Sequence, residues 1–552
     1  MKCVNKKKLY VFILGLIVLF SIYIRISGLD KYPGINADES WMANKAYYIH
    51  TTSILENLGG MNNYTGLLTP AFMNYWGKLF GFTHYSMRLL SVFFSLITII
   101  LTYIICFFLF SKAVSVISCL LLSSSIFFIC YSKIATPHVW ITSFLLISYF
   151  LLNHFINTGR TKKYILIIII LLVAFAVQLN PAPILFFVFM FFVLIDKQSI
   201  LKFYKNKYFP LFIIIFILGT SSMFFYTFKI IINIVKMNYD YLASLGFYNV
   251  AAKMLYRIPV YFEVLFLTVS GWRSIIYFSG FPAESYKIVF LISGIIFVSP
   301  VFFLYKSKDK NDMLIFYYIL IHILVMPFFL EFFNRNMHFP LLGEERYFMV
   351  LYPFIIIGAV RGWEFFFNKY NYRKIFYMSA AVYFIIILIV FKSMYADVFE
   401  KTGGGDGESL VRKVYAVNEK PVIEEVWQYL NENYKNELDN SVFIAPSFWT
   451  YHPLKFCSLD KIKNLYFWPE KQIPEIWITD KNKMQYKFAT IGWFEFFKYF
   501  YNKNIYLITF TDSSENYYLN RLKELSVSYD VIKTFYKKNN AAILKLYRIK
   551  SN

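Results

Sequence analysis

Acidic residues are scarce in the first 395 residues of this 552-residue chain. That part contains 14 Asp and Glu against 34 Lys and Arg. Its long apolar runs carry no Asp or Glu except near their ends, as at Glu331 and Glu364. Ion-coupled transporters and pumps usually need carboxylates at mid-membrane depth. The absence of such carboxylates argues against a transporter.

Cysteines and the common ligand motifs are also sparse. The chain has five Cys and no CxxC spacing, and only Cys457 lies away from the apolar runs, so no disulfide framework is indicated. The triple glycine at 403–405 follows an apolar run instead of a strand, and no GxxxxGK[ST] is present. We therefore expect no nucleotide cofactor. No HxxxH spacing defines metal ligands, so the sequence alone specifies no metal site.

Apolar and aromatic side chains are abundant, at 58% and 22% of the chain. A run of roughly 17 to 25 apolar residues can cross a bilayer. We predict a polytopic α-helical membrane protein with about eleven transmembrane helices, two of them short. The first run follows MKCVNKKK without a small-residue cleavage pattern, so we expect it to be retained and not removed as a signal peptide. The expected spans are 9–28, 89–110, 113–131, 139–156, 164–179, 183–195, 208–228, 287–305, 313–332, 347–367 and 375–395.

The net charge of +23 lies in basic clusters between the apolar runs. The clusters fall in every second turn, which is typical of cytoplasmic loops and not of a nucleic-acid-binding face. This alternation predicts a cytoplasmic N-terminus and places loops 29–88, 229–286 and 333–346 outside. We expect an interfacial or re-entrant helix at 258–278, because Glu263 and Arg273 interrupt that apolar stretch. The richness in Lys, Asn, Ile and Tyr is typical of an AT-rich bacterial genome, so the bilayer is expected to be a bacterial plasma membrane.

The composition changes after the last apolar run. Residues 396–410, with the Gly-rich KTGGGDGES, predict a flexible linker. From 396 onward the chain holds 22 basic and 19 acidic residues, which is typical of a soluble domain. We expect residues 411–552 to form an extracytoplasmic α/β domain. Its expected strands are Val442–Ala445, Ile476–Thr479, Ile505–Phe510 and Ala541–Tyr547, and its expected helices are Val422–Tyr434, Phe494–Tyr501 and Tyr517–Leu525.

The adjacent acidic pair Asp38-Glu39 lies on the first external loop. Ionisable residues converge on the same side of the membrane: Arg88, Lys133, His138, Arg257, Arg273, Arg335, His338, Glu344, Glu345 and Arg346. A carboxylate within hydrogen-bond reach of a nucleophile can act as a general base. Arginine and lysine can hold the oxygens of a departing phosphate. The combination favours a reaction in which a hydroxyl or an amine is deprotonated while a phosphate leaves.

Several short motifs accompany the pair. The loop continues as LLTPAFMNYWGKLFGFTHYSMRLLSVFFSL, with Gly81 in an LFG turn and Arg88 in an RLLS start to the second span. SKIATPHVW (132–140) and GEERYFMVLYPFIIIGAVRG (343–362) follow in order. This order resembles the GT-C glycosyltransferases, in the branch of protein O-mannosyltransferases and aminoarabinose (lipid A) transferases. The resemblance covers residues 1–395, and Lys133 stands where that branch usually has Arg.

The resemblance implies an inverting transfer of a sugar from a polyprenyl-phosphate donor to a protein, lipid or cell-envelope glycan. Asp38 would be the base, and Glu39 would contact the acceptor or a metal. Arg346, Lys133 and Arg88 would bind the donor phosphate. His138, His338 and Glu345 are further candidates. A divalent metal ion remains open as a cofactor.

Each of these residues also has a structural explanation. Asp38-Glu39 favours the start of a helix over SWMANKAYYI, because acidic residues stabilise helix N-termini. Glu344-Glu345 is typical of a solvated loop pair, and Arg88 or Arg346 can anchor to lipid headgroups. The two histidines can be structural. At the level of function, a flippase or exporter of lipid-linked glycan intermediates is the alternative, and a scaffold whose outer domain binds partners is a third hypothesis.

Overall fold

The computed structural model describes most of the chain. The ranges are 2–52, 68–158, 163–180, 182–194, 294–333, 344–395, 416–417, 420–459, 461–467, 502–511, 513–536 and 542–550, with a few single residues at 217, 292, 500 and 540 and six between 261 and 269. All structural statements below concern these residues.

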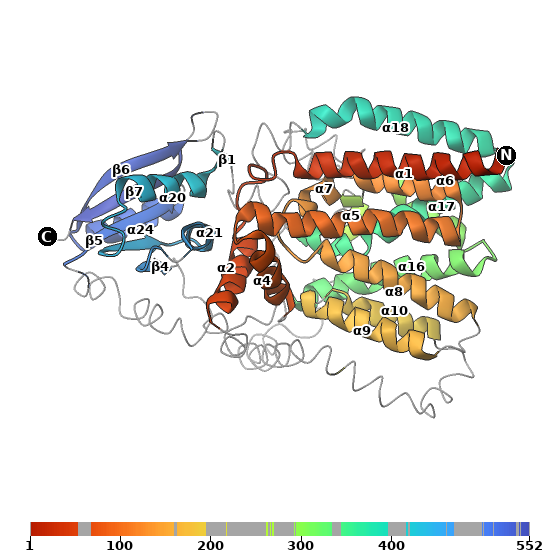
Figure 1. The fold of residues 1–552 in the computed structure, drawn as a ribbon, viewed down its shortest axis with the longest axis horizontal. Coiled ribbons are helices and arrows are strands. Elements are labelled where there is room, and N and C mark those ends of the chain that lie inside the picture. The colour runs from red at the N-terminus through yellow and green to blue at the C-terminus, as the bar shows by residue number, and fades with distance from the viewer. Residues whose placement is uncertain are drawn as a thin grey trace, which may run out of the picture.

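A bundle of long helices makes up the N-terminal part (Figure 1). The helices are α1 (Lys2–Ile26), α5 (His84–Leu109), α6 (Lys112–Ser124), α7 (Ile126–Ser132), α8 (Trp140–Asn157), α9 (Lys163–Leu179), α10 (Ile184–Leu194), α15 (Ser299–Leu304), α16 (Lys310–Phe333), α17 (Tyr352–Lys369) and α18 (Arg373–Tyr395), with a π-helical turn η3 (Gly294–Val298) before α15 and a 3₁₀ segment η4 (Glu344–Val350) before α17. The expected spans other than 208–228 overlap these helices. The range 208–228 and most of the expected interfacial helix lie outside the described residues.

By length and apolar composition, three described helices can cross a membrane: Leu9–Ile26, His84–Leu109 and Trp140–Asn157. A fourth is added if α6 and α7, which meet at a 63° bend, are one span. Ser125 lies at this bend. It caps α7, since its Oγ accepts from Phe128 N, and it contacts the Tyr352 hydroxyl of α17 at 2.5 Å. The bend therefore has a specific tertiary partner.

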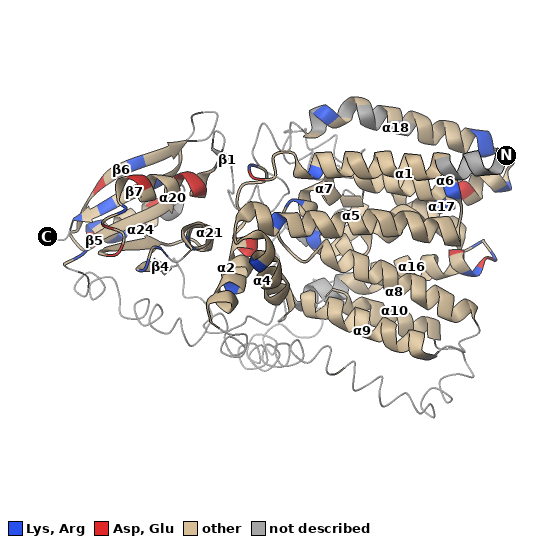
Figure 2. Cartoon of the chain, viewed as in Figure 1, with Lys and Arg blue, Asp and Glu red and all other residues tan. Residues whose placement is uncertain are grey.

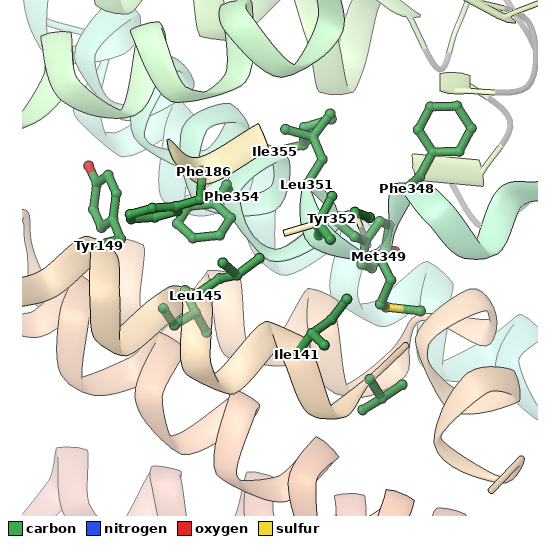
Figure 3. Packing of buried hydrophobic residues seen from close by; sticks show 14 of the residues in the cluster. Ile141, Leu145, Tyr149, Phe186, Phe348, Met349, Leu351, Tyr352, Phe354 and Ile355 are labelled. Carbon is green, nitrogen blue, oxygen red and sulfur yellow. The ribbon is translucent and has the colours of Figure 1, made fainter. Parts of the chain in front are cut away.

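The bundle core is apolar and aromatic. Figure 3 shows Ile141, Leu145 and Tyr149 of α8 packed against Phe186 of α10 and residues 348–355 of η4 and α17. One polar contact in the core joins Thr98 of α5 to Thr142 of α8 at 2.7 Å. This contact satisfies two hydroxyls that would otherwise be buried alone.

Small residues bring α17 close to its neighbours. Gly358 and Gly362 are spaced four residues apart on one face of α17. A Cβ at Gly362 would lie 2.0 Å from the carbonyl oxygen of Pro300 in α15, and a Cβ at Gly358 would lie 2.6 Å from a methyl of Ile319 in α16. This spacing is the pattern by which membrane helices approach closely.

Charged residues gather at the two ends of the bundle and on the C-terminal domain (Figure 2). At the end nearest the N-terminus, Arg361 of α17 makes two hydrogen bonds to Asp312 of α16, at 2.7 and 2.9 Å, and one to Glu364 at 2.7 Å. Glu364 also accepts a hydrogen bond from Ser111, at the junction of α5 and α6. Asp312 and Glu364, which lie near span ends, are thus paired within the protein.

The C-terminal domain is an α/β unit around a five-stranded sheet with the order β4-β3-β5-β7-β6. The pairs β3–β4 and β3–β5 are parallel, whereas β5–β7 and β6–β7 are antiparallel. The strands are β3 (Ser441–Ala445), β4 (Leu465–Phe467), β5 (Asn504–Phe510), β6 (Ser528–Tyr536) and β7 (Ala542–Lys550), with a small hairpin of β1 (Ala416–Val417) and β2 (Lys420–Pro421), and the helices are α20 (Val422–Asn433), α21 (Phe448–Ser458) and α24 (Ser513–Glu524).

Most expected elements of this domain coincide with observed ones. Four strands, β1, β2, β4 and β6, and one helix, α21, were not expected. The expected strand 476–479, most of the expected helix 494–501 and the linker 396–410 lie outside the described residues. Two further helices, α2 (Ala37–Thr51) and α4 (Leu68–Phe80), lie between the bundle and this domain (Figure 1). They form the layer that contains the acidic pair.

Candidate functional site

The start of α2 sends its two acidic side chains in different directions. Asn36 is the N-cap, and its Oδ1 accepts from Asp38 N at 2.8 Å. Glu39 completes the capping box, because its Oε1 accepts from Asn36 N at 2.8 Å. Glu39 is 1% exposed, whereas the Asp38 side chain is 21% exposed. The capping geometry therefore leaves Asp38 as the accessible carboxylate.

Glu39 and Arg88 form a buried ion pair. Arg88 Nη2 lies 2.5 Å from Glu39 Oε1, and Nε lies 3.1 Å from Oε2. Arg88 Nη1 donates to the carbonyls of Leu29 and Pro33, and Nη2 also donates to Gly34 O. These bonds use all five N–H donors of the guanidinium. Arg88 thus ties α5 to the loop before α2 and has no donor left for a phosphate.

The pair also fixes a third segment. Glu39 Oε2 accepts from Ala135 N at 2.9 Å, in the turn between α7 and α8. Four groups around one buried carboxylate satisfy its lone pairs, which is the condition for burying a charge. Glu39 therefore joins α2, α5 and the 133–139 turn.

Asp38 faces Arg346 of η4. Arg346 Nη1 lies 2.9 Å from Asp38 Oδ2, and the Arg346 side chain is 11% exposed. The guanidinium also lies 5.4 Å from the Tyr347 ring. The structure thus brings together two candidates that are 308 residues apart in the sequence.

His138 borders the same place. Its Nδ1 lies 3.3 Å from Asn180 Nδ2, and its ring packs on Tyr131 and Tyr347. Burial, together with the positive charge of Arg346, lowers the pKa of His138 to about 3, and the charge of Asp38 opposes this shift. The neutral imidazole of His138 therefore borders the site as an uncharged polar group.

Lys133 is buried behind the ion pair. Its Nζ donates to Ser27 O at 2.5 Å and to the Tyr395 hydroxyl at 2.6 Å, so it joins α7 to the ends of α1 and α18. Burial lowers the pKa of Lys133 to about 7, and the charges of Arg88 and Arg25 lower it too. Lys133 is therefore only partly protonated at neutral pH.

Arg25 was not among the sequence candidates, yet it belongs to this buried basic region. Its side chain is 0% exposed, Nη1 reaches Ser123 O at 3.3 Å, and the guanidinium lies 5.4 Å from the Phe128 ring. The sequence holds no signal that α6 and α7 bend over it.

Helix α21 of the C-terminal domain packs on α2 and on the start of α5. Asn44 Nδ2 donates to His452 O at 2.9 Å. The Phe456 ring packs edge to face on His84, with centroids 4.6 Å apart, and Cys457 Sγ lies 3.7 Å from His84 Nε2. Helix α21 (Phe448–Ser458) therefore contributes to the layer that holds Asp38.

The remaining candidates cannot be placed. His338, Arg257, Arg273 and Arg335 lie outside the described residues, and of Glu344 and Glu345 only the backbone, in η4, is described. Among the described residues, no group of three or more His, Cys, Asp or Glu side chains is arranged to hold a metal ion.

The helical bundle, the helical layer with its acidic pair and the α/β domain together have the GT-C glycosyltransferase fold, which is the fold of a multi-pass membrane protein. Residues 65–226 match the family model described as dolichyl-phosphate-mannose-protein mannosyltransferase. The expected resemblance to the GT-C glycosyltransferases is thereby confirmed. The matched region includes Arg88, Lys133 and His138, whereas Asp38 and Arg346 lie outside it.

Among solved structures, ArnT has a similar fold over nearly the whole chain. ArnT from Cupriavidus metallidurans bound to undecaprenyl phosphate has a TM-score of 0.55 at 10% identity, and its apo form has 0.56 at 11%; both comparisons cover 96% of this chain and 98% of ArnT. AglB, an oligosaccharyltransferase from Archaeoglobus fulgidus, has 12% identity and a TM-score of 0.45 over 99% of this chain and 74% of AglB. No curated protein matches the sequence significantly.

Proposed function

We propose that the chain is a membrane glycosyltransferase that moves a sugar from a polyprenyl-phosphate donor to an acceptor at the extracytoplasmic face. The observation that carries the proposal is the contact between Asp38 and Arg346, a carboxylate and a guanidinium that are both partly accessible. They lie between the bundle and the C-terminal domain. The solved ArnT complex with undecaprenyl phosphate supports a lipid phosphate as the donor class.

In the proposed reaction, Asp38 takes the proton of the acceptor hydroxyl. The acceptor oxygen forms a bond to the anomeric carbon while the bond from that carbon to the phosphate oxygen breaks, and the configuration inverts. The electron pair leaves with the polyprenyl phosphate. General-base assistance of this kind contributes roughly 10²- to 10⁴-fold in rate.

We assign the leaving phosphate to Arg346, with Lys133 as a second contact after a rearrangement that releases it from Ser27 and Tyr395. A phosphate would raise the proton affinity of Lys133, since a nearby anion favours the charged form. We assign Arg88 to holding Glu39, because its N–H donors are already used. Glu39 then positions α2 and does not touch the substrate.

The proposal includes the membrane arrangement. Residues 1–395 would form the catalytic membrane domain with about eleven spans and a cytoplasmic N-terminus, residues 396–410 a linker, and residues 411–552 an extracytoplasmic domain in a bacterial plasma membrane. The acceptor is a protein, lipid or envelope glycan, and the transferred sugar is a hexose or a pentose. A divalent metal ion remains open, and no nucleotide takes part.

The test uses purified full-length protein with a panel of polyprenyl-phosphate sugars and a cell-envelope extract that supplies the acceptor, and it scores the release of free polyprenyl phosphate. The parent should release it from at least one donor, which identifies the sugar. Asp38→Asn should release at least 100-fold less at unchanged thermal stability, and Asp439→Asn, a change at a carboxylate 65% exposed on the C-terminal domain, should behave as the parent. No release from any donor would refute the proposed function.

A further inference from the structure

Helices α2 and α21, which pack together, each carry one buried nitrogen atom without a partner among the described residues. Lys45 Nζ and His452 Nδ1 are both inaccessible to solvent and have no hydrogen-bond partner in the described part of the chain. A buried polar atom without a partner is costly unless a ligand or water completes it. Nothing in the reaction proposed above uses either group.

Helix geometry connects Lys45 to the catalytic carboxylate. Asp38, Trp41 and Lys45 are spaced i, i+3 and i+7, so they share one face of α2. Seven residues of α-helix span roughly 10 Å. Lys45 Nζ lies 3.9 Å from the centre of the Trp41 ring, so the ammonium group itself lies over the indole on this face.

Helix α21 holds His452 opposite this face. The hydrogen bond from Asn44 to His452 O fixes the backbone, and the imidazole packs on Phe448 and Tyr451, with centroids 4.3 and 4.9 Å away. Asn44 directly precedes Lys45, so this hydrogen bond places His452 beside the turn of α2 that carries Lys45. The C-terminal domain thus contributes a side chain beside the catalytic helix.

The electrostatics point to an anion. Within the described residues, no carboxylate is hydrogen-bonded to Lys45, and burial lowers the pKa of Lys45 to about 7. Burial and the charges of Lys455 and Lys45 keep the pKa of His452 well below its ordinary value, so the ring is neutral and can donate through one nitrogen. A phosphate or carboxylate at this place would supply the missing partner of both groups.

We propose that Lys45 and His452 form an acceptor subsite for an anionic group, a phosphate or a carboxylate carried by the acceptor. The subsite holds that group roughly 10 Å from Asp38 along α2, so the acceptor hydroxyl reaches the base while the anion stays at the domain boundary. The inference rests on the proposed function, and it makes the C-terminal domain part of substrate selection.

The test measures binding without a donor, so it is independent of transfer. Glycerol 1-phosphate and glucuronate are titrated calorimetrically into the full-length protein, one probe for each kind of anion. The parent should bind one of them. Lys45→Met, which keeps an unbranched side chain but removes the charge, and His452→Leu should each weaken binding at least tenfold, whereas Lys45→Arg should keep it within threefold. Lys78→Met changes an exposed lysine on α4 and should have no effect.

The outcomes separate this inference from the proposed function. Binding of neither probe by the parent, or equal binding by Lys45→Met and the parent, would overturn the subsite whatever the donor assay shows. Thermal midpoints of the variants are measured beside the titrations, and if Lys45→Met unfolds, His452→Leu decides. If Asp38→Asn released polyprenyl phosphate as fast as the parent, only the assignment of Asp38 as the base would be refuted. Anion binding that depends on Lys45 would still support the subsite.

Discussion

The neighbouring carboxylates Asp38 and Glu39 have opposite surroundings although they differ by one position. The helix start was predictable from the acidic pair and the following residues. Which of the two would be buried was not, because that depends on Arg88, 49 residues further on, and on a backbone amide at Ala135. Contacts between segments far apart in the chain leave no local pattern in one sequence. The resemblance supplied Arg346 as a site residue, and the structure supplied its partner.

Removing Arg88 tests the assignment of this residue to structure. Arg88→Met would leave Glu39 charged and buried without its main partner, which costs about 3–5 kcal/mol in comparable cases. We expect a clear fall in the unfolding temperature of the detergent-solubilised protein, with Lys78→Met as the control. An Arg88→Met protein as stable as the parent that has lost only donor affinity would contradict the assignment and restore Arg88 as a phosphate contact.

His138 gives a pH dependence with a definite sign. Its pKa is about 3 in the folded protein, against an ordinary value near 6.5, so between these values the unfolded chain binds the proton and the folded chain does not. Stability is therefore complete above about pH 6.5 and falls as the pH is lowered through this window, by about 2 kcal/mol between pH 6.5 and 5.

Replacing His138 with Gln should flatten this acid dependence. The measurement is the unfolding temperature at pH 7 and pH 5 for the parent, His138→Gln and His50→Gln, the last changing an exposed histidine at the end of α2. If the two variants lost equal stability on acidification, the neutral buried state of His138 would be wrong.

At the scale of elements, apolar runs predicted the helices of the bundle well. A run of that length has few other structures available in a membrane. The bend between α6 and α7 was not predicted, since the run is continuous in composition and Ser125 acts through Tyr352 of a distant helix. Helix α21 was missed because Pro453 lies inside it. Strand β6 was missed because its side chains alternate between exposed and half-buried, without an apolar run.

The contact between α15 and α17 tests close helix packing. Gly362→Ala would place a methyl 2.0 Å from a backbone oxygen of Pro300, so the helices must separate. We expect a loss of about 1–3 kcal/mol, typical of overpacking. Gly15→Ala in α1 is the control, since its Cβ would meet nothing within 4 Å. Equal unfolding temperatures for the two variants would contradict this packing.

At the scale of the whole molecule, the C-terminal domain is joined to the bundle through α21. Phe456 is 2% exposed and belongs to the apolar core of the bundle, whereas Leu454 of the same helix belongs to the core of the domain. The presence of a separate α/β domain was predictable from the change in composition after residue 395. Its contact with α2 was not, since the two segments are about 400 residues apart and neither carries a docking motif.

Phe456→Ala should loosen this contact. Truncating a buried aromatic ring costs about 3–5 kcal/mol, and here the loss falls on the interface between domain and bundle. We expect faster amide hydrogen exchange in α2 while β5 and β7 stay protected. Tyr536→Ala, at a position 49% exposed on β6, should leave α2 unchanged. Exchange that rises equally in the sheet would show unfolding of the domain instead.

The central claim is that Asp38 is the base of a sugar transfer from a lipid phosphate. The direct measurement is single-turnover release of polyprenyl phosphate by the parent and by Asp38→Asn, with donor affinity determined separately for each. Asp38→Asn should keep a donor affinity within threefold of the parent and should release polyprenyl phosphate at least 100-fold more slowly, in line with the contribution of a general base. Equal single-turnover rates at equal donor affinity would contradict it.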